Sequence, residues 1–409
     1  MSQSKLHFLQ TASLFLVLII DAMGMGLILP LLGPLFVDPL GGMLASNSSV
    51  ILRDLMYALT ISSFAFFMFF GAPFLGDLSD HLGRKKVLML CLFGTAFGSL
   101  LSAFGIIIKS LVLLIAGRSI AGFMCGSQAL AQAAIVDMST PENKARNLGF
   151  ISFASCVGFA LGPYVSGVLT AHEMIVKFGF IMPFIAAGLL SFLNAGALLF
   201  TFKETFYPKP IQRLHLTKGL DVFISAFINK KIRSLAIIYL LAEGGWALYF
   251  QCIPLYLIKN FKYTSTQIGH VMGYMGVIFG ITLLWLIRIC TKHLTARQIC
   301  NYSFLSCAVG FFMVLLNTEW SVWFGAIPAC VGGALFYVAL LTLFSNVVDA
   351  DSQGWVMGVF AAVAAFSWTI GGFLTGTLFL FGLFTPFIIA GSLMLLSYYL
   401  LFVDKSITN

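Results

Sequence analysis

Long runs of apolar residues, separated by short polar connections, make up most of this chain of 409 residues. Twelve runs are long enough to cross the hydrocarbon core of a bilayer, which is about 30 Å thick and needs about 20 helical residues. We expect these helices near residues 8–32, 55–76, 87–108, 111–136, 147–170, 178–202, 234–257, 266–287, 299–316, 321–346, 355–380 and 385–402. The pattern therefore predicts an all-α polytopic membrane protein with twelve transmembrane helices.

The longest polar connection, residues 203–233, has six apolar runs on either side. Its stretch LDVFISAF is typical of a short amphipathic helix. Glycines recur between the two halves at an offset of 209 residues, in the pairs Gly149/Gly358, Gly162/Gly371 and Gly167/Gly376. We therefore expect an N-terminal six-helix bundle over 1–202, a central loop over 203–233 and a C-terminal six-helix bundle over 234–409.

Composition supports a protein that faces lipid. Asp, Glu, Lys and Arg make up 9% of the residues, whereas soluble proteins contain about a quarter. Seventeen of the 23 basic residues fall in connections on the side of the two termini and five in connections on the other side. The positive-inside rule then places both termini in the cytoplasm. The net charge of +8 therefore reflects membrane orientation, and no nucleic acid is expected as a partner.

Patterns of catalytic and metal-binding chemistry are missing from the sequence. The eight cysteines show no C-x-x-C spacing, which argues against a zinc site and against a disulfide framework. We find no G-x-S-x-G, H-E-x-x-H or P-loop pattern. We therefore expect neither an enzyme nor a bound metal or cofactor.

One short connection concentrates charge. The stretch GDLSDHLGRKK at 76–86 has five charged residues among eleven. Gly76 and Gly83 are expected to let the backbone turn, and Asp80 is expected to pair with Arg84 or with the start of a helix. The corresponding connection of the second half, 288–297, is basic but contains no acid.

This charged connection resembles the signature of the major facilitator superfamily. RSIAGFMCG at 118–126 is similar to the fourth-helix motif of that family, and GFALGPYVSG at 158–167 resembles the fifth-helix motif of its antiporters, with Gly158, Gly162, Pro163 and Gly167 in the matching positions. DAMGMGLILPLL at 21–32 and DSQGWVMG at 351–358 resemble the drug/proton antiporter branch, which includes tetracycline-resistance and multidrug efflux transporters. The resemblance implies two six-helix bundles that rock around a central site lined by helices 1, 4, 7 and 10.

Three charged residues fall deep inside apolar runs: Asp21, Arg118 and Glu243. An ionised group at mid-bilayer costs on the order of 3 kcal/mol, so such residues face a partner or a wet cavity. We expect Asp21 to be the proton-coupling site, with Arg118 tuning its proton affinity, because a guanidinium cannot itself release a proton at working pH. Glu243 is the rival carrier, and the sequence leaves the choice open.

Polar and aromatic side chains on the same runs are candidates for the substrate cavity. Gln128 and Gln132 lie four residues apart and share one helix face. Trp246, Tyr249 and Gln251 follow Glu243, and Met25 follows Asp21. Side chains of this kind suit an adaptable pocket for amphipathic molecules.

The resemblance implies a secondary active transporter, which we expect in the bacterial inner membrane. We expect a monomer that exchanges protons for a small drug-like or metabolite substrate and exports it by alternating access, with the proton gradient as its energy source. The partners expected are the substrate, protons and the lipid bilayer. The alternative is a proton-coupled importer of a nutrient or siderophore-like molecule on the same fold.

Overall fold

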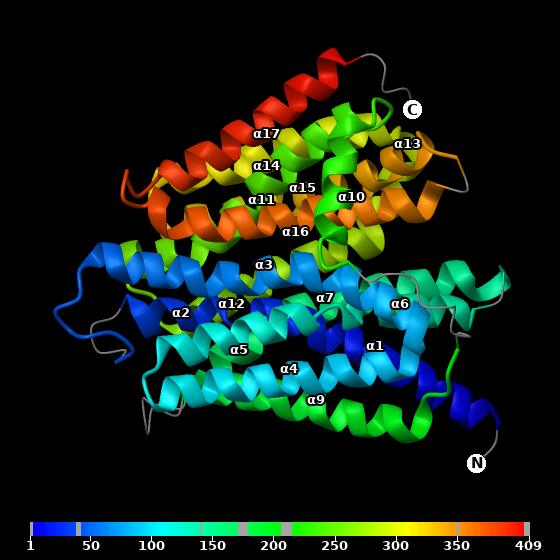
Figure 1. The fold of residues 1–409 in the computed structure, drawn as a ribbon. Helices are drawn as coiled ribbons and strands as arrows, with labels where there is room; N and C mark the ends of the chain where they lie inside the picture. The colour runs from blue at the N-terminus through cyan, green and yellow to red at the C-terminus, as the bar shows by residue number, and fades with distance from the viewer. Residues whose placement is uncertain are drawn as a thin grey trace. The chain divides into compact units, whose positions relative to one another are not determined.

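The computed structural model describes residues 3–37, 42–139, 141–170, 179–205, 215–349 and 352–404, and the regular structure of these residues is helical. The helices of the first half are α1 (Gln3–Gly26), α2 (Leu29–Phe36), α3 (Val50–Leu82), α4 (Arg84–Ile107), α5 (Leu111–Met124), α6 (Ser127–Asp137), α7 (Pro141–Thr170) and α9 (Met182–Thr201). They are followed by α10 (Lys218–Ile228), α11 (Arg233–Phe261), α12 (Ser265–Ile281), the π-helix η2 (Thr282–Leu286), α13 (Ile287–His293), α14 (Ala296–Met313), the 3₁₀ turn η3 (Val314–Leu316), α15 (Glu319–Asn346), α16 (Gln353–Leu378) and α17 (Thr385–Val403). Figure 1 shows their arrangement.

Twelve helical stretches of the described residues are long and apolar enough to cross a membrane, which confirms the twelve predicted runs. Turns interrupt two of the stretches, where α1 gives way to α2 at residues 27–28 and α5 to α6 at residues 125–126. The second stretch is longer than predicted, because α3 continues to Leu82. The expectation of a turn at Gly76 is therefore wrong, since Gly76 lies inside α3 and only Gly83 separates α3 from α4.

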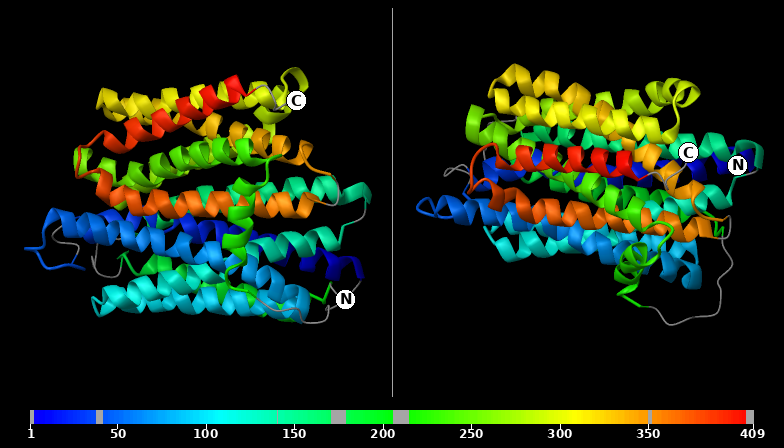
Figure 2. Two further views of the ribbon diagram at one scale, coloured as in Figure 1. Left: turned by 45° about the horizontal axis from the view of Figure 1, so that its top comes forward. Right: turned by 90° about the horizontal axis from the view of Figure 1, so that it is seen from above.

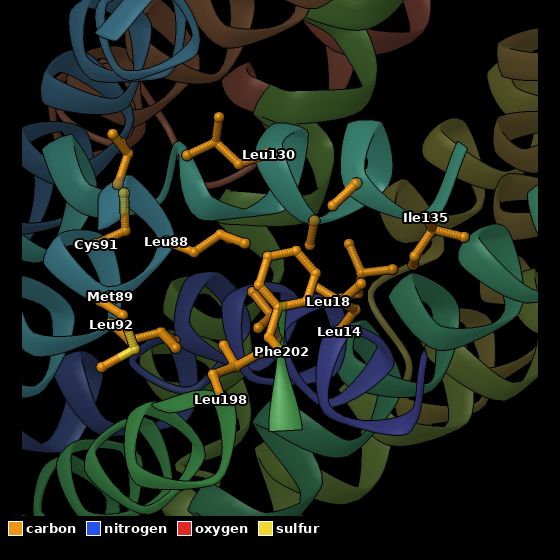
Figure 3. Packing of buried hydrophobic residues seen from close by; sticks show 14 of the residues in the cluster. Leu14, Leu18, Leu88, Met89, Cys91, Leu92, Leu130, Ile135, Leu198 and Phe202 are labelled. Carbon is orange, nitrogen blue, oxygen red and sulfur yellow. The ribbon is translucent and has the colours of Figure 1, made fainter. Parts of the chain in front are cut away.

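The folded chain divides into two compact units. Unit 1 comprises Met1–Ser46, Ser63–Gly219 and Ser265–Gly273. In it, α4 lies alongside α5 and α9, and α1 packs against α7 (Figure 1). Its core is aliphatic, and Figure 3 shows the Phe202 ring among Leu14 and Leu18 of α1 and Leu88 of α4. This core fixes α1, which carries Asp21, against its neighbours.

Unit 2 comprises Asn47–Ser62, Leu220–Thr264 and Tyr274–Asn409. Here α14 packs along α15 and α17, and α11 packs against α16 and α17 (Figure 2). The predicted amphipathic helix is confirmed as α10. Its Phe223 lies 4.4 Å, between ring centroids, from Phe366 of α16, and the Trp355 indole donates a hydrogen bond of 3.1 Å to Ser225. These contacts attach α10 to unit 2.

Two paired glycines lie where backbones approach closely. A Cβ at Gly167 of α7 would lie 2.9 Å from the Ser265 carbonyl oxygen at the start of α12. A Cβ at Gly376 of α16 would collide with the Asp54 carbonyl in the first part of α3. Small residues permit such approaches between membrane helices. Because the two glycines are 209 residues apart, these contacts fit the repeat seen in the sequence, while the six-plus-six division stays a prediction.

Candidate functional site

Asp21 lies on α1 shortly before the interruption of that membrane segment. α1 ends at Gly26, and α2 restarts at Leu29 with Pro30 in its first turn, where a missing N–H costs nothing. A Cβ at Gly26 would lie 2.9 Å from the Pro163 Cδ of α7, so only glycine fits here. Interrupted membrane helices free backbone groups and often carry binding sites.

A second interruption faces the first. α5 ends before Cys125, and α6 begins at Ser127. The Ser127 hydroxyl donates a hydrogen bond of 2.5 Å to Oδ2 of Asp21. A Cβ at Gly122 would collide with the Phe64 carbonyl, which explains one glycine of the sequence RSIAGFMCG. Sequence reasoning missed Ser127, because a serine inside a membrane helix most often bonds its own backbone.

Asp21 is 3% exposed, and Oδ1 of its carboxylate has no hydrogen-bond partner in the part of the chain that the structure describes. Arg118 of α5 is 5% exposed. Its Nη1 donates a hydrogen bond of 3.4 Å to the Gly24 carbonyl, and its guanidinium lies 4.3 Å from the centroid of the Phe64 ring. Among the described residues, no ion pair joins Asp21 to Arg118.

Asp21 and Arg118 nevertheless line one cavity of unit 1. Its volume is about 410 Å³ including the part open to solvent, and the space that a water molecule can enter is enough for about one water. The lining residues are Ile20, Asp21, Gly24, Leu27, Phe64, Thr95, Ser99, Arg118, Ala121, Cys125, Phe184, Ala187 and Ser191. Because the space that a water can enter holds about one water, the cavity admits a proton or a water but not a drug-sized molecule.

Glu243 occupies a different kind of site in unit 2. It is 4% exposed on α11 and accepts a hydrogen bond of 2.9 Å from the Trp368 indole of α16. Tyr239, one turn earlier on α11, stacks on Phe360 at 3.9 Å between ring centroids. Trp368 was not foreseen from the sequence. Glu243 therefore has an indole N–H as its hydrogen-bond partner.

The candidate cavity residues of α11 are buried within unit 2. Tyr249 stacks on Phe311 with centroids 4.1 Å apart. Trp246 packs against Phe250 with centroids 5.9 Å apart, and Gln251 donates a hydrogen bond of 3.1 Å to the Trp368 carbonyl. Their part in substrate binding stays a prediction.

Of the candidates in the first half, Gln128 and Gln132 are half-buried on α6. The Gln128 amide donates a hydrogen bond of 3.4 Å to Ser155 of α7. Met25 belongs to α1, but its side chain lies outside the described part of the structure. These three residues also remain candidates only.

The charged connection forms a cluster at the start of α4. Arg84 Nη1 lies 2.9 Å from Oδ1 of Asp80, which confirms the expected pair, and its Nε lies 3.6 Å from Oδ2 of Asp137 on α6. Gly83 has φ +94° and ψ 150°, a conformation that a side chain would strain. Asp77, one turn before the cluster, forms an ion pair with Lys218.

Glu204, which lies 120 residues after Arg84 in the sequence, completes the cluster. Its carboxylate accepts hydrogen bonds from the backbone N–H groups of Arg84 at 2.9 Å and Lys85 at 3.1 Å. It therefore caps α4, which Gly83 cannot do for lack of a side chain. The corresponding helix of unit 2, α14, is capped locally by Thr295 and Gln298 in a capping box. Glu204 was not predicted, because no local pattern connects it to α4.

The fifth-helix motif lets α7 approach α1 closely. A Cβ at Gly158 would collide with the Ile19 carbonyl, and one at Gly162 would lie 2.6 Å from the Met23 carbonyl oxygen. Pro163 packs against Gly26, at the interruption after α1. The motif thus shapes the segment that carries Asp21.

Comparison with known proteins gives matches along nearly the whole chain. A model of the Major Facilitator Superfamily matches residues 14–371. The class C tetracycline resistance protein of Escherichia coli is 25% identical over 356 residues, which cover 85% of this chain and 83% of that protein. The quinolone resistance protein NorA of Staphylococcus aureus (strain COL) is 24% identical over 388 residues, which cover 94% and 93%.

Solved transporters share the fold. The human organic anion transporter MFSD10 (TETRAN) superposes with a TM-score of 0.72 at 20% identity, over 98% of this chain and 100% of that chain. The xylose transporter XylE from E. coli superposes with a TM-score of 0.75 at 13% identity, over 97% of each chain. The twelve-helix all-α fold expected from the sequence is thereby confirmed.

Proposed function

This chain belongs to the Major Facilitator Superfamily, and we propose that it is a proton-coupled antiporter that exports a small drug-like or metabolite substrate by alternating access. It is a transporter of this type and an integral membrane protein. Direction, coupling ion and substrate class are the parts that we propose.

The observation that carries the proposal is the setting of Asp21. One carboxylate oxygen is held by Ser127, the other has no protein partner among the described residues, and Asp21 lines a cavity shared with Arg118. A buried carboxylate tends to bind a proton, whereas a nearby guanidinium favours its ionised form. A modest change in the distance between the two groups would therefore shift the balance between proton binding and release.

Such a site couples transport to protons by linkage. A cationic substrate that binds near Asp21 favours the ionised carboxylate and promotes release of the proton, and proton binding in turn weakens substrate binding by the same factor. If the two ligands cross the membrane in opposite directions, the result is exchange. Arg118 keeps its charge throughout, so the titrating group in this scheme is the acid.

Export is supported by the relatives that cover most of the chain, which are named for resistance to tetracycline and to quinolones. The fold itself does not decide direction, because a D-xylose–proton symporter shares it with a TM-score of 0.75 at 14% identity. Proton-coupled uptake of a nutrient is therefore the second candidate.

We propose further that the membrane is the bacterial inner membrane and that both termini are cytoplasmic, as the basic residues favour. Single cysteines at His215 and Thr318, which are exposed, test this orientation with a membrane-impermeant thiol reagent. Labelling from outside is expected at residue 318 and not at residue 215, and the reverse pattern would contradict the orientation.

The function is tested in two stages with the purified protein. A thermal-shift screen of tetracyclines, quinolones, amphipathic cations, D-xylose and nucleosides identifies a ligand. Flux of that ligand is then measured in reconstituted vesicles with the pH gradient imposed in either direction. Antiport predicts that the ligand moves in the direction opposite to the protons. Movement of the ligand in the same direction as the protons would contradict export and support the second candidate.

A further inference from the structure

The cavity beside Asp21 has polar walls on two further helices. Thr95 and Ser99 lie one turn apart on α4, and Ser191 lies on α9. Ser191 is fully buried, and none of these hydroxyls belongs to a motif that the sequence singled out. The alternating-access mechanism proposed above makes no use of them.

Four polar atoms at this cavity are buried without a hydrogen-bond partner in the described ranges of the chain: Oδ1 of Asp21, Oγ1 of Thr95, Nε of Arg118 and Oγ of Ser191. Buried polar atoms are nearly always paired, either with protein or with ordered water. A buried water needs two to four polar partners and room for itself, and the cavity supplies both. These polar atoms can therefore hold a water, although most of the lining is apolar.

We propose that this cavity holds a water that relays protons to Asp21 from the outer side, separately from the path of the substrate. The inference rests on the proposed function, since it requires Asp21 to bind the proton. In the relay a hydrated proton passes from water to the Asp21 carboxylate and leaves a neutral water behind. The hydroxyls of Thr95 and Ser191 hold that water and are unchanged by the transfer.

The direction of the relay follows from the order of residues along the helices. On α1 the lining extends from Asp21 onward to Gly24 and Leu27, away from the N-terminus. On α9, which runs the opposite way, it extends from Ser191 back to Phe184. With the termini in the cytoplasm, both extensions lead toward the outer side, and Asp21 lies near the inner end of the cavity.

Few other titratable groups surround the carboxylate. Arg118 of α5 and Cys125 after α5 line the same cavity, and Cys91 is buried on α4. α9 contains no titratable side chain, α6 supplies the Ser127 hydroxyl, and α7 meets α1 through glycines. The guanidinium of Arg118 would repel a metal cation, so the walls suit water and a proton better than a sodium ion.

The test uses the proton itself as the probe and needs no identified substrate. After a rapid drop in pH, the rise of the protonated carboxyl band of Asp21 is followed by time-resolved infrared spectroscopy of the purified full-length protein. The band is assigned by its loss in Asp21→Asn. Thr95→Val and Ser191→Ala are expected to slow its rise about tenfold, the order expected when one hydrogen bond to the relaying water is lost.

Ser102→Ala is the matched control. Ser102 is a buried hydroxyl on the same helix α4 that already bonds the Gly98 carbonyl at 2.9 Å and does not line the cavity, so this variant is expected to protonate at the wild-type rate. Wild-type rates in Thr95→Val and Ser191→Ala, at unchanged unfolding temperature, would overturn the relay while leaving Asp21 as the proton site. Absence of any band that depends on Asp21 would instead contradict the proposed function itself.

Discussion

Units 1 and 2 each contain a buried acid that the sequence singled out as a candidate proton carrier, but the two acids have different surroundings. Asp21 in unit 1 is held by one hydroxyl and has one oxygen free of protein partners among the described residues. Glu243 in unit 2 accepts a hydrogen bond from the Trp368 indole, and Tyr239, one turn earlier on the same helix, stacks on Phe360. Asp21 belongs to a cavity lining that also includes Arg118, whereas the residues lining that cavity do not include Glu243.

This difference indicates how an acid inside a membrane protein becomes a proton carrier. Both carboxyl groups are shielded from bulk water, so burial alone does not distinguish them. A carrier also needs a route for the proton and a charged neighbour whose distance from the carboxyl group can change. We propose that Asp21 has both, through the cavity that it shares with Arg118. The choice that the sequence left open stays a prediction in favour of Asp21.

The largest effect is expected from neutralising the two acids in turn. Asp21→Asn should lower transport driven by a pH gradient at least about 100-fold, as expected when a positioned proton carrier is lost. Glu243→Gln keeps an oxygen that can accept the Trp368 hydrogen bond and should retain most of the transport. Flux in reconstituted vesicles at matched protein density measures both. A larger loss in Glu243→Gln than in Asp21→Asn would reverse the assignment.

The junctions between helices extend the comparison of the units. In unit 1 only Gly83, at φ +94°, separates α3 from α4, whereas in unit 2 Leu294 lies between α13 and α14 in an extended conformation. Gly83→Ala should cost about 1–3 kcal/mol of unfolding free energy, because a side chain strains this conformation. A Cβ there would also collide with the Glu204 carboxylate.

Gly76→Ala is the matched control for this prediction. Gly76 lies inside α3 with no heavy atom near its Cβ position, so alanine should stabilise the helix by about 0.5–1 kcal/mol. Thermal unfolding in detergent compares the two variants. If both variants change the unfolding temperature equally and in the same direction, the conformation of Gly83 does not require a glycine.

The charges at the same junction should affect transport more weakly than the buried acid. Asp80 pairs with Arg84, and we hypothesise that the pair helps to hold the outward-open state. Asp80→Asn should lower flux about fivefold, equivalent to about 1 kcal/mol, while substrate affinity and membrane insertion stay near normal. Arg288→Gln, in the acid-free connection of unit 2, serves as the control and should transport normally. Unchanged flux in Asp80→Asn would leave the cluster with a role in topology alone.

The smallest effect is expected at the caps of α4 and α14. Glu204→Gln removes a negative charge from the start of α4 and should cost about 0.5 kcal/mol. Gln298→Glu adds a charge to the capping box of α14 and should stabilise the protein by a similar amount. Unfolding temperatures check both, and a change of the same direction in both variants would rule out an effect of the helix dipole.

Much of the fold could be predicted from the sequence because a membrane helix needs a long apolar run, and such runs are visible directly. The interruptions at residues 27–28 and 125–126 could not, since glycine inside an apolar run is compatible with a continuous helix. Asp21 and Arg118 stood out because charge is costly in lipid. Ser127 and Glu204 act on atoms about a hundred residues away in sequence, so only the folded chain brings them to their partners.

The central claim is that Asp21 binds the proton that is exchanged for substrate. It is tested most directly by adding the ligand found in the thermal-shift screen to purified protein in weak buffer and recording proton release with a pH indicator. We predict release by the wild type and by Glu243→Gln, and no release by Asp21→Asn although the variant still binds the ligand. Release that persists in Asp21→Asn and disappears in Glu243→Gln would instead assign the proton to Glu243 on α11.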